Sequence, residues 1–509
     1  YKRQPLPLPQ AHAADGIEWR KCPSVERLPS PVECGTVSVP VDHAKPDGER
    51  IDLTVSRIRA TGEPGERRGS LLYNPGGPGG NGMLFPLYPR ALGGVWKRLN
   101  TRYDLVGYAP RGVGRSAPLS CQDPLEFVQG PNRSPRRPSP AYKEERKAQA
   151  AAYARGCAQA QGTERLRHYT TPDNARDLDA IRAALGERKL NFLGVSYGTY
   201  IGAVYATLFP ERVRRLVLDS VVDPSPGKIW YRSNLDQNPA FERRWGDWKA
   251  WAARHHGTYG LGSTPRQVQR AFDEVRDAVD RKPAGGTVGS RELLESYFDV
   301  AYADSTWDRH ARALAAFRDG DPEPLAALAA PGGESGAGDG AADAADAENG
   351  NAVYNAVQCA DAPWPRDWAR WDADNSAMAP FAPFLTWENA WMNLPCAHWK
   401  APSSRPLDVR TEPGTPPSVL LLAATRDAAT PYEGALEAQR RLSGASLVTE
   451  RGAGNHGVAG GNECVDAHLE RYLLQGKTPG DHADCAARSA PQPESGPARQ
   501  EQVRGKGRG

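Results

Sequence analysis

The chain has 509 residues, of which 64 are basic and 61 acidic, and its formal net charge is +3. This length exceeds the usual size of one domain, so we expect two or three domains or one large core with a substantial insertion. A charge so close to balance does not predict a surface for nucleic acid, and no apolar run of about 18 residues is present to cross a bilayer. We therefore expect neither a nucleic-acid partner nor a membrane span.

Residues 1–34 are rich in Pro and polar side chains and predict an N-terminal extension. The chain starts at Tyr1, and residues 1–10 have neither the apolar core nor the cleavage site of a signal peptide, so we expect a processed N-terminus. Alternating apolar side chains at 35–40 and 51–58 then predict antiparallel strands at the leading edge of a sheet.

The next elements are short apolar runs that end in Gly- or Pro-rich loops, a pattern typical of strands in a parallel sheet. They lie at residues 70–73, 103–108, 189–193, 213–218, 418–424 and 446–449. Helical periodicity occurs at 141–160 and 172–185, with Thr171 as the expected N-cap before Pro172. Strands that alternate with helices predict an α/β fold with a mostly parallel, doubly wound sheet.

A long insertion separates the strand at 213–218 from the strand at 418–424. Residues 225–400 hold most of the tryptophans in helix-like stretches and predict a large, mainly helical lid above the strand ends. The core would then consist of residues 35–224 and 401–485.

Two segments are too poor in bulky apolar side chains to pack. Residues 331–351, within the insertion, are nearly all Gly, Ala, Asp, Ser and Glu and predict a mobile loop. Residues 486–509 are rich in Pro, Gly, Gln and Arg and predict a disordered tail.

The most informative motif is Gly-Val-Ser-Tyr-Gly at residues 194–198, between a predicted strand and a helical stretch that ends near Pro210. A serine on a sharp strand-to-helix turn needs neighbours without Cβ atoms, so that the strained backbone can expose its hydroxyl. The motif therefore predicts that Ser196 is a catalytic nucleophile. The alternative is a Gly-Ser loop without chemistry.

A serine hydroxyl needs a base, and the base needs a carboxylate that fixes its tautomer. In this architecture the acid and then the histidine follow the serine, on loops after late strands. Asp427 and His456 occupy such loops and are the predicted acid and base. Asp219 and Asp223 are rival acids, whose alternative roles are to bind loop amides and to form a turn before Pro224.

The tetrahedral intermediate of acyl transfer needs two fixed hydrogen-bond donors, each worth roughly 10² to 10³ in turnover. We expect the backbone amide of Tyr197 to be one donor. The Gly-rich loop at residues 74–80 should supply the other, and we choose the amide of Gly77.

The same loop raises the possibility of a dinucleotide site, because Gly77, Gly79 and Gly82 match Gly-x-Gly-x-x-Gly. A proline lies inside the match, and Pro86 and Pro89 interrupt the helix that should carry the pyrophosphate. These prolines argue against a redox enzyme.

Eight cysteines are present without the Cys/His spacing of a zinc site. Their even number favours disulfides and a secreted, extracellular protein over free thiols in a cytosolic enzyme. Pairing of sequence neighbours predicts the disulfides Cys22–Cys34, Cys121–Cys157, Cys359–Cys396 and Cys464–Cys485.

Four segments together, at 74–80, 103–116, 194–198 and 427–456, resemble the α/β-hydrolase superfamily and, within it, the proline iminopeptidase group of serine peptidases. The Gly-Gly-Pro-Gly loop is characteristic of that group. The long insertion, the paired cysteines and the sequence Asp-Ala-Ala-Thr-Pro from Asp427 are similar to its secreted actinobacterial tripeptidyl aminopeptidases. The resemblance implies a triad of Ser196, Asp427 and His456, with the amides of Tyr197 and Gly77 as the oxyanion hole.

From this resemblance we expect a secreted serine aminopeptidase that releases tripeptides from the free N-termini of peptides, by way of an acyl-enzyme and without a metal or organic cofactor. We expect a monomer. Such an enzyme must hold the substrate ammonium, and Asp361 and Glu388, beside tryptophans in the insertion, are the candidate carboxylates. The alternatives are a proline iminopeptidase that releases single residues, a secreted esterase or lactonase with the same triad, and a binding module on an inactive hydrolase fold.

Overall fold

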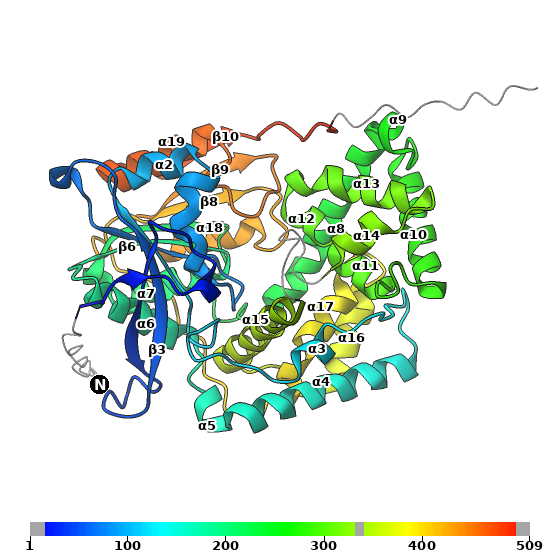
Figure 1. The fold of residues 1–509 in the computed structure, drawn as a ribbon, viewed down its shortest axis with the longest axis horizontal. Coiled ribbons are helices and arrows are strands. Elements are labelled where there is room, and N and C mark those ends of the chain that lie inside the picture. The colour runs from blue at the N-terminus through cyan, green and yellow to red at the C-terminus, as the bar shows by residue number, and fades with distance from the viewer. Residues whose placement is uncertain (1–15, 331–339, 495–509) are drawn as a thin grey trace, which may run out of the picture.

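A ten-stranded sheet lies at the centre of one half of the molecule (Figure 1). The structure is a computed structural model, and it describes residues 16–330 and 340–494. Within these residues the strand order is β1-β2-β3-β5-β4-β6-β7-β8-β9-β10. The strands span Arg20–Lys21 (β1), Glu33–Pro40 (β2), Arg50–Ile58 (β3), Ser70–Asn74 (β4), Asp104–Tyr108 (β5), Leu190–Val195 (β6), Val213–Asp219 (β7), Leu420–Ala424 (β8), Ser446–Arg451 (β9) and His482–Ala486 (β10).

The sheet is antiparallel at one edge and parallel elsewhere. Strands β1, β2, β3 and β5 pair antiparallel, and the strands from β5 through β4 to β10 pair in parallel. This topology confirms the predicted α/β class. Strands β1 and β10 are additions to the predicted set, and their mostly exposed side chains carry no apolar run that would reveal them.

Helices cover both faces of the sheet, and each face has its own apolar cluster. Helices α6 (Thr171–Ala184), α7 (Tyr197–Leu208) and α18 (Tyr432–Arg441) pack in the cluster on one face. Helices α2 (Gly94–Asn100) and α19 (Glu463–Gln475) pack in the other. Coverage on both sides explains why β4 to β9 are buried almost throughout.

The N-cap of α6 is Thr170, one residue before the predicted Thr171. The Thr170 hydroxyl oxygen accepts the amide of Asp173, as an N-cap does. The Thr171 side chain is used elsewhere, because its hydroxyl lies 2.6 Å from a carboxylate oxygen of Asp361 and 2.9 Å from the hydroxyl of Tyr197.

The chain between β7 and β8 forms a helical layer beside the sheet (Figure 1). We call residues 225–400 the lid segment. Its helices are α8 (Tyr231–Arg254), α9 (His256–Tyr259), α10 (Pro265–Arg281), α11 (Ser290–Ser296), α12 (Asp299–Tyr302), α13 (Trp307–Arg318), α14 (Glu323–Leu328), α15 (Gly340–Asp361), α16 (Trp368–Met378) and α17 (Thr386–Asn393). A third apolar cluster, rich in Trp and Tyr, holds α8, α10, α11 and α13 together.

Residues before Ser196 also join the helical layer. Helix α4 (Pro140–Gln161) packs against α17 and against the 3₁₀ turn Leu394–His398. The remaining short helices are α1 (Tyr88–Ala91), α3 (Pro124–Phe127) and α5 (Thr163–Leu166). The helical layer is therefore built from two separate stretches of the chain.

The predicted mobile loop at 331–351 is wrong for its second part, since α15 begins at Gly340. This part is rich in Ala, which favours helix, and Glu348 in it is buried. A carboxylate oxygen of Glu348 accepts the amide of Cys121 at 2.8 Å and the hydroxyl of Tyr153 at 3.1 Å. These tertiary contacts order a segment whose composition alone suggested a loop. Residues 331–339 lie outside the described residues.

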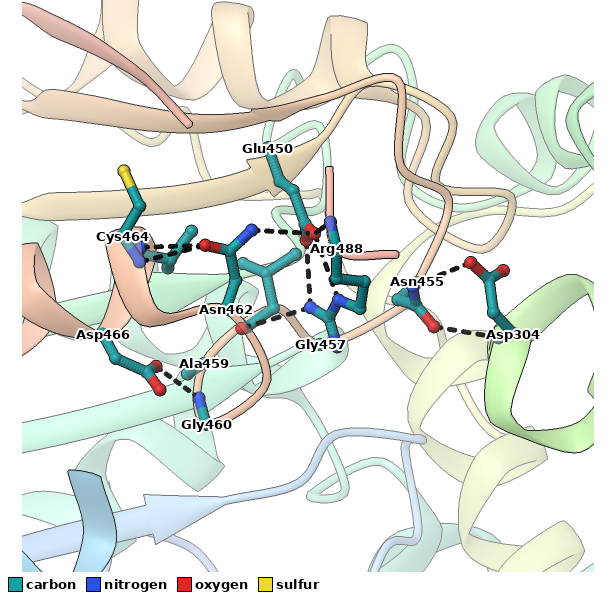
Figure 2. A network of polar contacts seen from close by, with 12 residues as sticks. Asp304, Glu450, Asn455, Gly457, Ala459, Gly460, Asn462, Cys464, Asp466 and Arg488 are labelled. Atoms are coloured by element: carbon teal, nitrogen blue, oxygen red, sulfur yellow. Dashed lines mark hydrogen bonds and ion pairs between the residues drawn. The ribbon is translucent and has the colours of Figure 1, made fainter. Parts of the chain in front are cut away.

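The predicted disordered tail is likewise wrong for residues 486–494, since β10 ends at Ala486. The Arg488 guanidinium pairs with the buried carboxylate of Glu450 at 2.9 Å (Figure 2). The indole Nε1 of Trp251 donates to the carbonyl of Pro491 at 2.8 Å. These contacts fasten the segment to the sheet and to the helical layer. Residues 495–509 lie outside the described residues.

Four disulfides cross-link the described residues, and they are the four predicted pairs: Cys22–Cys34, Cys121–Cys157, Cys359–Cys396 and Cys464–Cys485. Within residues 16–330 and 340–494, no helix is both long and apolar enough to cross a bilayer.

Candidate active site

Ser196 lies on the sharp turn between β6 and α7. Its φ of 57° and ψ of −126° are strained for a residue with a side chain, and its amide donates to the carbonyl of Asp219 at 3.0 Å. A Cβ on Gly194 would lie 2.2 Å from the carbonyl oxygen of Gly198, and one on Gly198 would lie 2.6 Å from that of Asn74. Both glycines of the motif are therefore required, because the backbone passes too close for any side chain.

Asp427, which is buried, and His456, which is partly buried, form a pair on two later loops. Nδ1 of His456 lies 3.0 Å and 2.9 Å from the two carboxylate oxygens of Asp427. The same carboxylate accepts the amides of Ala429 and Thr430 and the Thr430 hydroxyl, each at 3.0 Å. A carboxylate fixed in this way keeps the proton on Nδ1 and leaves Nε2 as the free basic nitrogen of His456.

Asp219 joins the His456 loop to the Ser196 turn. Its carboxylate accepts the amides of Val458, at 3.0 and 3.1 Å, and Ala459, at 2.9 Å, while its backbone carbonyl accepts the Ser196 amide. Both loops are thus fastened to the end of β7. Among the described residues no hydrogen bond links Ser196 Oγ to His456, and such bonds commonly tighten only when substrate is bound.

The two rival acids take the alternative roles that the sequence allows. Asp219 binds loop amides, and the Asp223 carboxylate accepts the amide of Ser225 at 2.9 Å in a turn. Neither makes a hydrogen bond to His456 in the described part of the chain, whereas Asp427 does.

The charges around His456, the predicted base, raise its pKa. Burial alone would lower the pKa of His456, but the charge and hydrogen bond of Asp427, together with the charge of Asp219, raise it above the usual value. Burial raises the pKa of Asp219 to about 6, against the opposing effect of the amides of Val458 and Ala459.

Two backbone amides beside Ser196 are free to bind an anion. Gly77 and Tyr197 line the same pocket as Ser196, and neither amide donates to another described residue. The loop before Gly77 is fixed because the side-chain oxygen of Asn74 accepts the Gly76 amide at 2.9 Å. A Cβ on Gly76, whose φ is 97°, would lie 2.8 Å from the Ser196 Cβ and 2.9 Å from the Tyr197 amide. The close approach of the glycine loop to the serine turn therefore places the free amides of Gly77 and Tyr197 beside Ser196.

The pocket that contains Ser196 has a volume of about 390 Å³, within the range of roughly 300–1,000 Å³ that is typical of ligand sites. The core contributes Ser196, the glycine loop, the loop after β7 and the start of α18. The lid segment contributes one side of α8 together with Tyr302, Tyr354 and Gln358. The pocket is therefore enclosed between the strand ends and the helical layer.

Charged side chains on the pocket wall differ in how they are paired. Asp236 forms ion pairs with Lys228 and Arg232. Asp223 and Glu433 have no ion pair with any described residue, and they share one wall, because a Cβ on Gly434, next to Glu433, would lie 2.8 Å from the Asp223 amide. Arg243 also lines the pocket, and no ion pair joins it to either carboxylate. The pocket thus presents two carboxylates that form no ion pair with a described residue.

The prediction that Asp361 and Glu388 hold a substrate ammonium does not fit this structure, since neither lines the pocket. Asp361 is buried and accepts the amide and hydroxyl of Thr171, each at 2.6 Å, and the indole of Trp230 at 3.1 Å. Glu388 accepts the hydroxyl of Ser134 at 2.7 Å and lies 3.6 Å from Arg291. Both carboxylates are occupied by internal partners.

Sequence reasoning missed the pocket carboxylates for identifiable reasons. In the sequence, Asp223 is a candidate only as a rival acid to Asp427, and its place beside a proline indicates a turn. Glu433 follows the Asp427 loop by only a few residues, and that proximity is the one signal that could have found it.

Sheet and site together place the protein among the α/β hydrolases.

Comparison with known proteins identifies the family. Residues 69–270 match the family described as alpha/beta hydrolase fold, and residues 382–485 match TAP-like protein. The chain is 50% identical over 482 residues to a tripeptidyl aminopeptidase of Streptomyces lividans, and the aligned residues cover 94% of this chain and 88% of the relative. It is 31% identical over 504 residues to the serine protease Hip1 of Mycobacterium tuberculosis, covering 92% and 91%. It is 33% identical over 475 residues to a carboxylesterase B of the same species, covering 89% and 86%. The chain therefore belongs to the α/β-hydrolase family of the tripeptidyl aminopeptidases and is a serine hydrolase.

Proposed function

We propose that this protein is a secreted serine aminopeptidase that releases tripeptides from the free N-termini of peptides. The relative of Streptomyces lividans, at 50% identity, is named for this activity. The observation that carries the proposal is that the carboxylates of Asp223 and Glu433 line the pocket of Ser196 and form no ion pair with a described residue. An uncharged acyl group would gain nothing from them, whereas an ammonium would gain charge-assisted hydrogen bonds.

In the proposed mechanism, Ser196 Oγ attacks the carbonyl carbon of the third residue while His456 Nε2 takes its proton. Asp427 orients His456 and stabilises the imidazolium that forms. The amides of Tyr197 and Gly77 bind the oxyanion of the tetrahedral intermediate. His456 then gives the proton to the leaving amine, and an acyl-enzyme on Ser196 remains. Water, activated by His456, hydrolyses this ester and frees the tripeptide.

The pocket accounts for the proposed preference for short, free N-termini. Asp223 and Glu433 would hold the ammonium, and the wall formed by α8 and α15 would limit how much chain lies on the acyl side of Ser196. The helical layer would keep folded proteins from the site while it admits oligopeptides and exposed termini. The four disulfides support an oxidising, extracellular location.

An esterase is the second candidate, because one relative at 33% identity is named carboxylesterase B. The same triad and oxyanion donors serve an ester as well as an amide, so the pocket decides between them.

Mass analysis of products tests the proposal. The purified enzyme is given a long peptide with a free amine, the N-acetylated twin of that peptide, and a simple acyl ester, with the Ser196→Ala variant as control. We expect successive loss of tripeptides from the free peptide only, and a preference for it that weakens in Asp223→Asn and Glu433→Gln. Ester cleavage with both peptides intact would reject the peptidase, and loss of single residues would favour an iminopeptidase.

A further inference from the structure

A chain of side-chain amides runs through the helical layer to the wall of the pocket. Nδ2 of Asn393 donates to the backbone carbonyl of Asn389 at 2.8 Å, which fixes the Asn393 side-chain oxygen as an acceptor. That oxygen accepts the Tyr354 hydroxyl at 3.0 Å and Nδ2 of Asn234 at 3.4 Å. Nδ2 of Asn234 also donates to Oε1 of Gln358 at 3.0 Å. The backbone carbonyl of Asn389, at the start of this series of hydrogen bonds, therefore sets the orientation of each side-chain amide in it.

Gln358 is the last member of this series of hydrogen-bonded side-chain amides. Its side chain is held on α15, only 4% of the residue is exposed, and its backbone carbonyl accepts the indole of Trp364 at 2.8 Å. Because Oε1 is taken by Asn234, the free group of the amide is Nε2. This nitrogen has no hydrogen-bond partner among the described residues, it is not among the fully enclosed polar atoms, and Gln358 lines the Ser196 pocket. A buried donor in such a position requires a partner from a ligand or from water.

We propose that Gln358 Nε2 donates a hydrogen bond to a main-chain carbonyl oxygen of the substrate, on the acyl side of the bond that Ser196 attacks. The donor has no charge and cannot accept, so it binds neither the substrate ammonium nor an apolar side chain. A tripeptidyl group carries two internal peptide carbonyls between its ammonium and the reacting carbonyl, whereas a simple acyl group carries none. Gln358 is thus a specificity residue that distinguishes peptides from simple esters, an assignment that rests on the proposed function.

The rest of the pocket agrees with this role. Gln237, the other glutamine on the wall, already donates its Nε2 to the carbonyl of Ala429 at 2.7 Å. The amide nitrogen of Gln237 is therefore already bonded within the protein. The Gln358 amide is held by the bond from Asn234 to its Oε1, so no rearrangement of the lid segment is needed to present Nε2. Preorganisation of this kind favours the bound state because little ordering remains to be done when substrate enters.

The test compares two substrates in steady-state kinetics: a tripeptide anilide with a free amine, and p-nitrophenyl acetate. Gln358→Met removes both amide atoms, and Gln358→Glu keeps an acceptor for Asn234 while it removes the donor. For both variants we expect kcat/KM on the anilide to fall about tenfold, as for loss of one hydrogen bond, with the acetate rate unchanged. Gln237→Met is the matched control and should preserve the ratio of the two rates. Thermal unfolding checks that each variant is folded.

A second arm identifies the partner atom. Replacing one internal peptide carbonyl of the anilide by a thiocarbonyl weakens the hydrogen-bond acceptor. The wild type should therefore cleave the thiocarbonyl substrate more slowly than the normal anilide. Gln358→Met, which lacks the donor, should cleave the two substrates at equal rates. The inference is overturned if the wild type releases tripeptides and the Gln358 variants keep its ratio of anilide to acetate rates. It is also overturned if both rates fall together, because Gln358 would then act only on the fold. A wild type that cleaves acetate but no peptide rejects the proposed function itself.

Discussion

Asn455 and Asp304 form two hydrogen bonds with each other across the boundary between the His456 loop and the lid segment (Figure 2). The Asn455 side-chain oxygen accepts the Asp304 amide at 2.9 Å, and its Nδ2 donates to the Asp304 carboxylate at 3.3 Å. Next to this pair, the His456 amide donates to the carbonyl of Tyr302 at 2.7 Å, and the Tyr302 ring packs edge-on against the imidazole. The position of the proposed base therefore depends on the lid segment as well as on the sheet.

Replacing Asn455 by Ala should lower kcat for peptide and ester substrates alike, because the proposed base, His456, would serve both reactions. Loss of the two bonds to Asp304 loosens the loop, and a misplacement of about 1 Å can cost up to roughly 10² in rate. Steady-state kinetics on both substrates measure the effect, and KM should change little because Asn455 does not line the pocket. An unchanged kcat in a folded variant would show that the loop is held by its other contacts alone.

The pH dependence of kcat/KM should follow His456. Since its pKa is raised, largely by Asp427 against the effect of burial, the activity should be lost on the acid side at a pH above the ordinary histidine value of 6.5. Asp219→Asn removes a charge that raises this pKa, so the acid limb should move to lower pH. Rate profiles between about pH 4 and pH 9 for both proteins give the comparison. A limb that stays in place in Asp219→Asn would mean that the Asp219 charge does not reach the base.

The strands and the Ser196 turn could be predicted because their signals are local. The buried strands contain short apolar runs, and the turn is formed by five adjacent residues. The candidate acid and base could also be placed, since the late strands before Asp427 and His456 show the same apolar runs. Where backbone spacing and local composition decide the structure, one sequence is enough.

The contents of the pocket could not be predicted, because they depend on which helices of the lid segment face the strand ends. Asp361 and Glu388 looked suitable as isolated carboxylates, yet Thr171 and Ser134, far away in sequence, satisfy them. The first part of helix α15 falls in the predicted loop for the same reason, since Glu348 is ordered by contacts to Cys121 and other distant groups. Such pairings between distant residues leave no local pattern.

Gly76→Ala should abolish most activity while the protein stays folded. The added Cβ would lie 2.5 Å from the carbonyl oxygen of Val195 and 2.9 Å from the Tyr197 amide, so it would displace the glycine loop from the elbow and disturb both proposed oxyanion donors. Loss of one such donor costs roughly 10² to 10³ in kcat. Gly162→Ala is the control for backbone strain, since Gly162 also has a positive φ, 77°, and no atom lies within 4 Å of its Cβ position. Comparable rates for the two variants would contradict the assignment of the glycine loop.

Asp361 should make the protein less stable as the pH rises. Burial raises its pKa to about 7, although the hydrogen bonds from Thr171 and Trp230 act in the opposite direction. The folded state therefore keeps a proton that the unfolded state, with an ordinary pKa of 3.8, has already lost. The stabilisation from this group is complete below that ordinary value and disappears as the pH rises through about 7.

Denaturant unfolding of the wild type and Asp361→Asn measures this directly, because the variant lacks the titrating group and its free energy of unfolding should fall less steeply between about pH 4 and pH 8. Asp236→Asn, a change at a carboxylate already paired with Lys228, should retain the wild-type slope over this range. Identical slopes for the wild type and Asp361→Asn would show that Asp361 is ionised in the folded protein throughout.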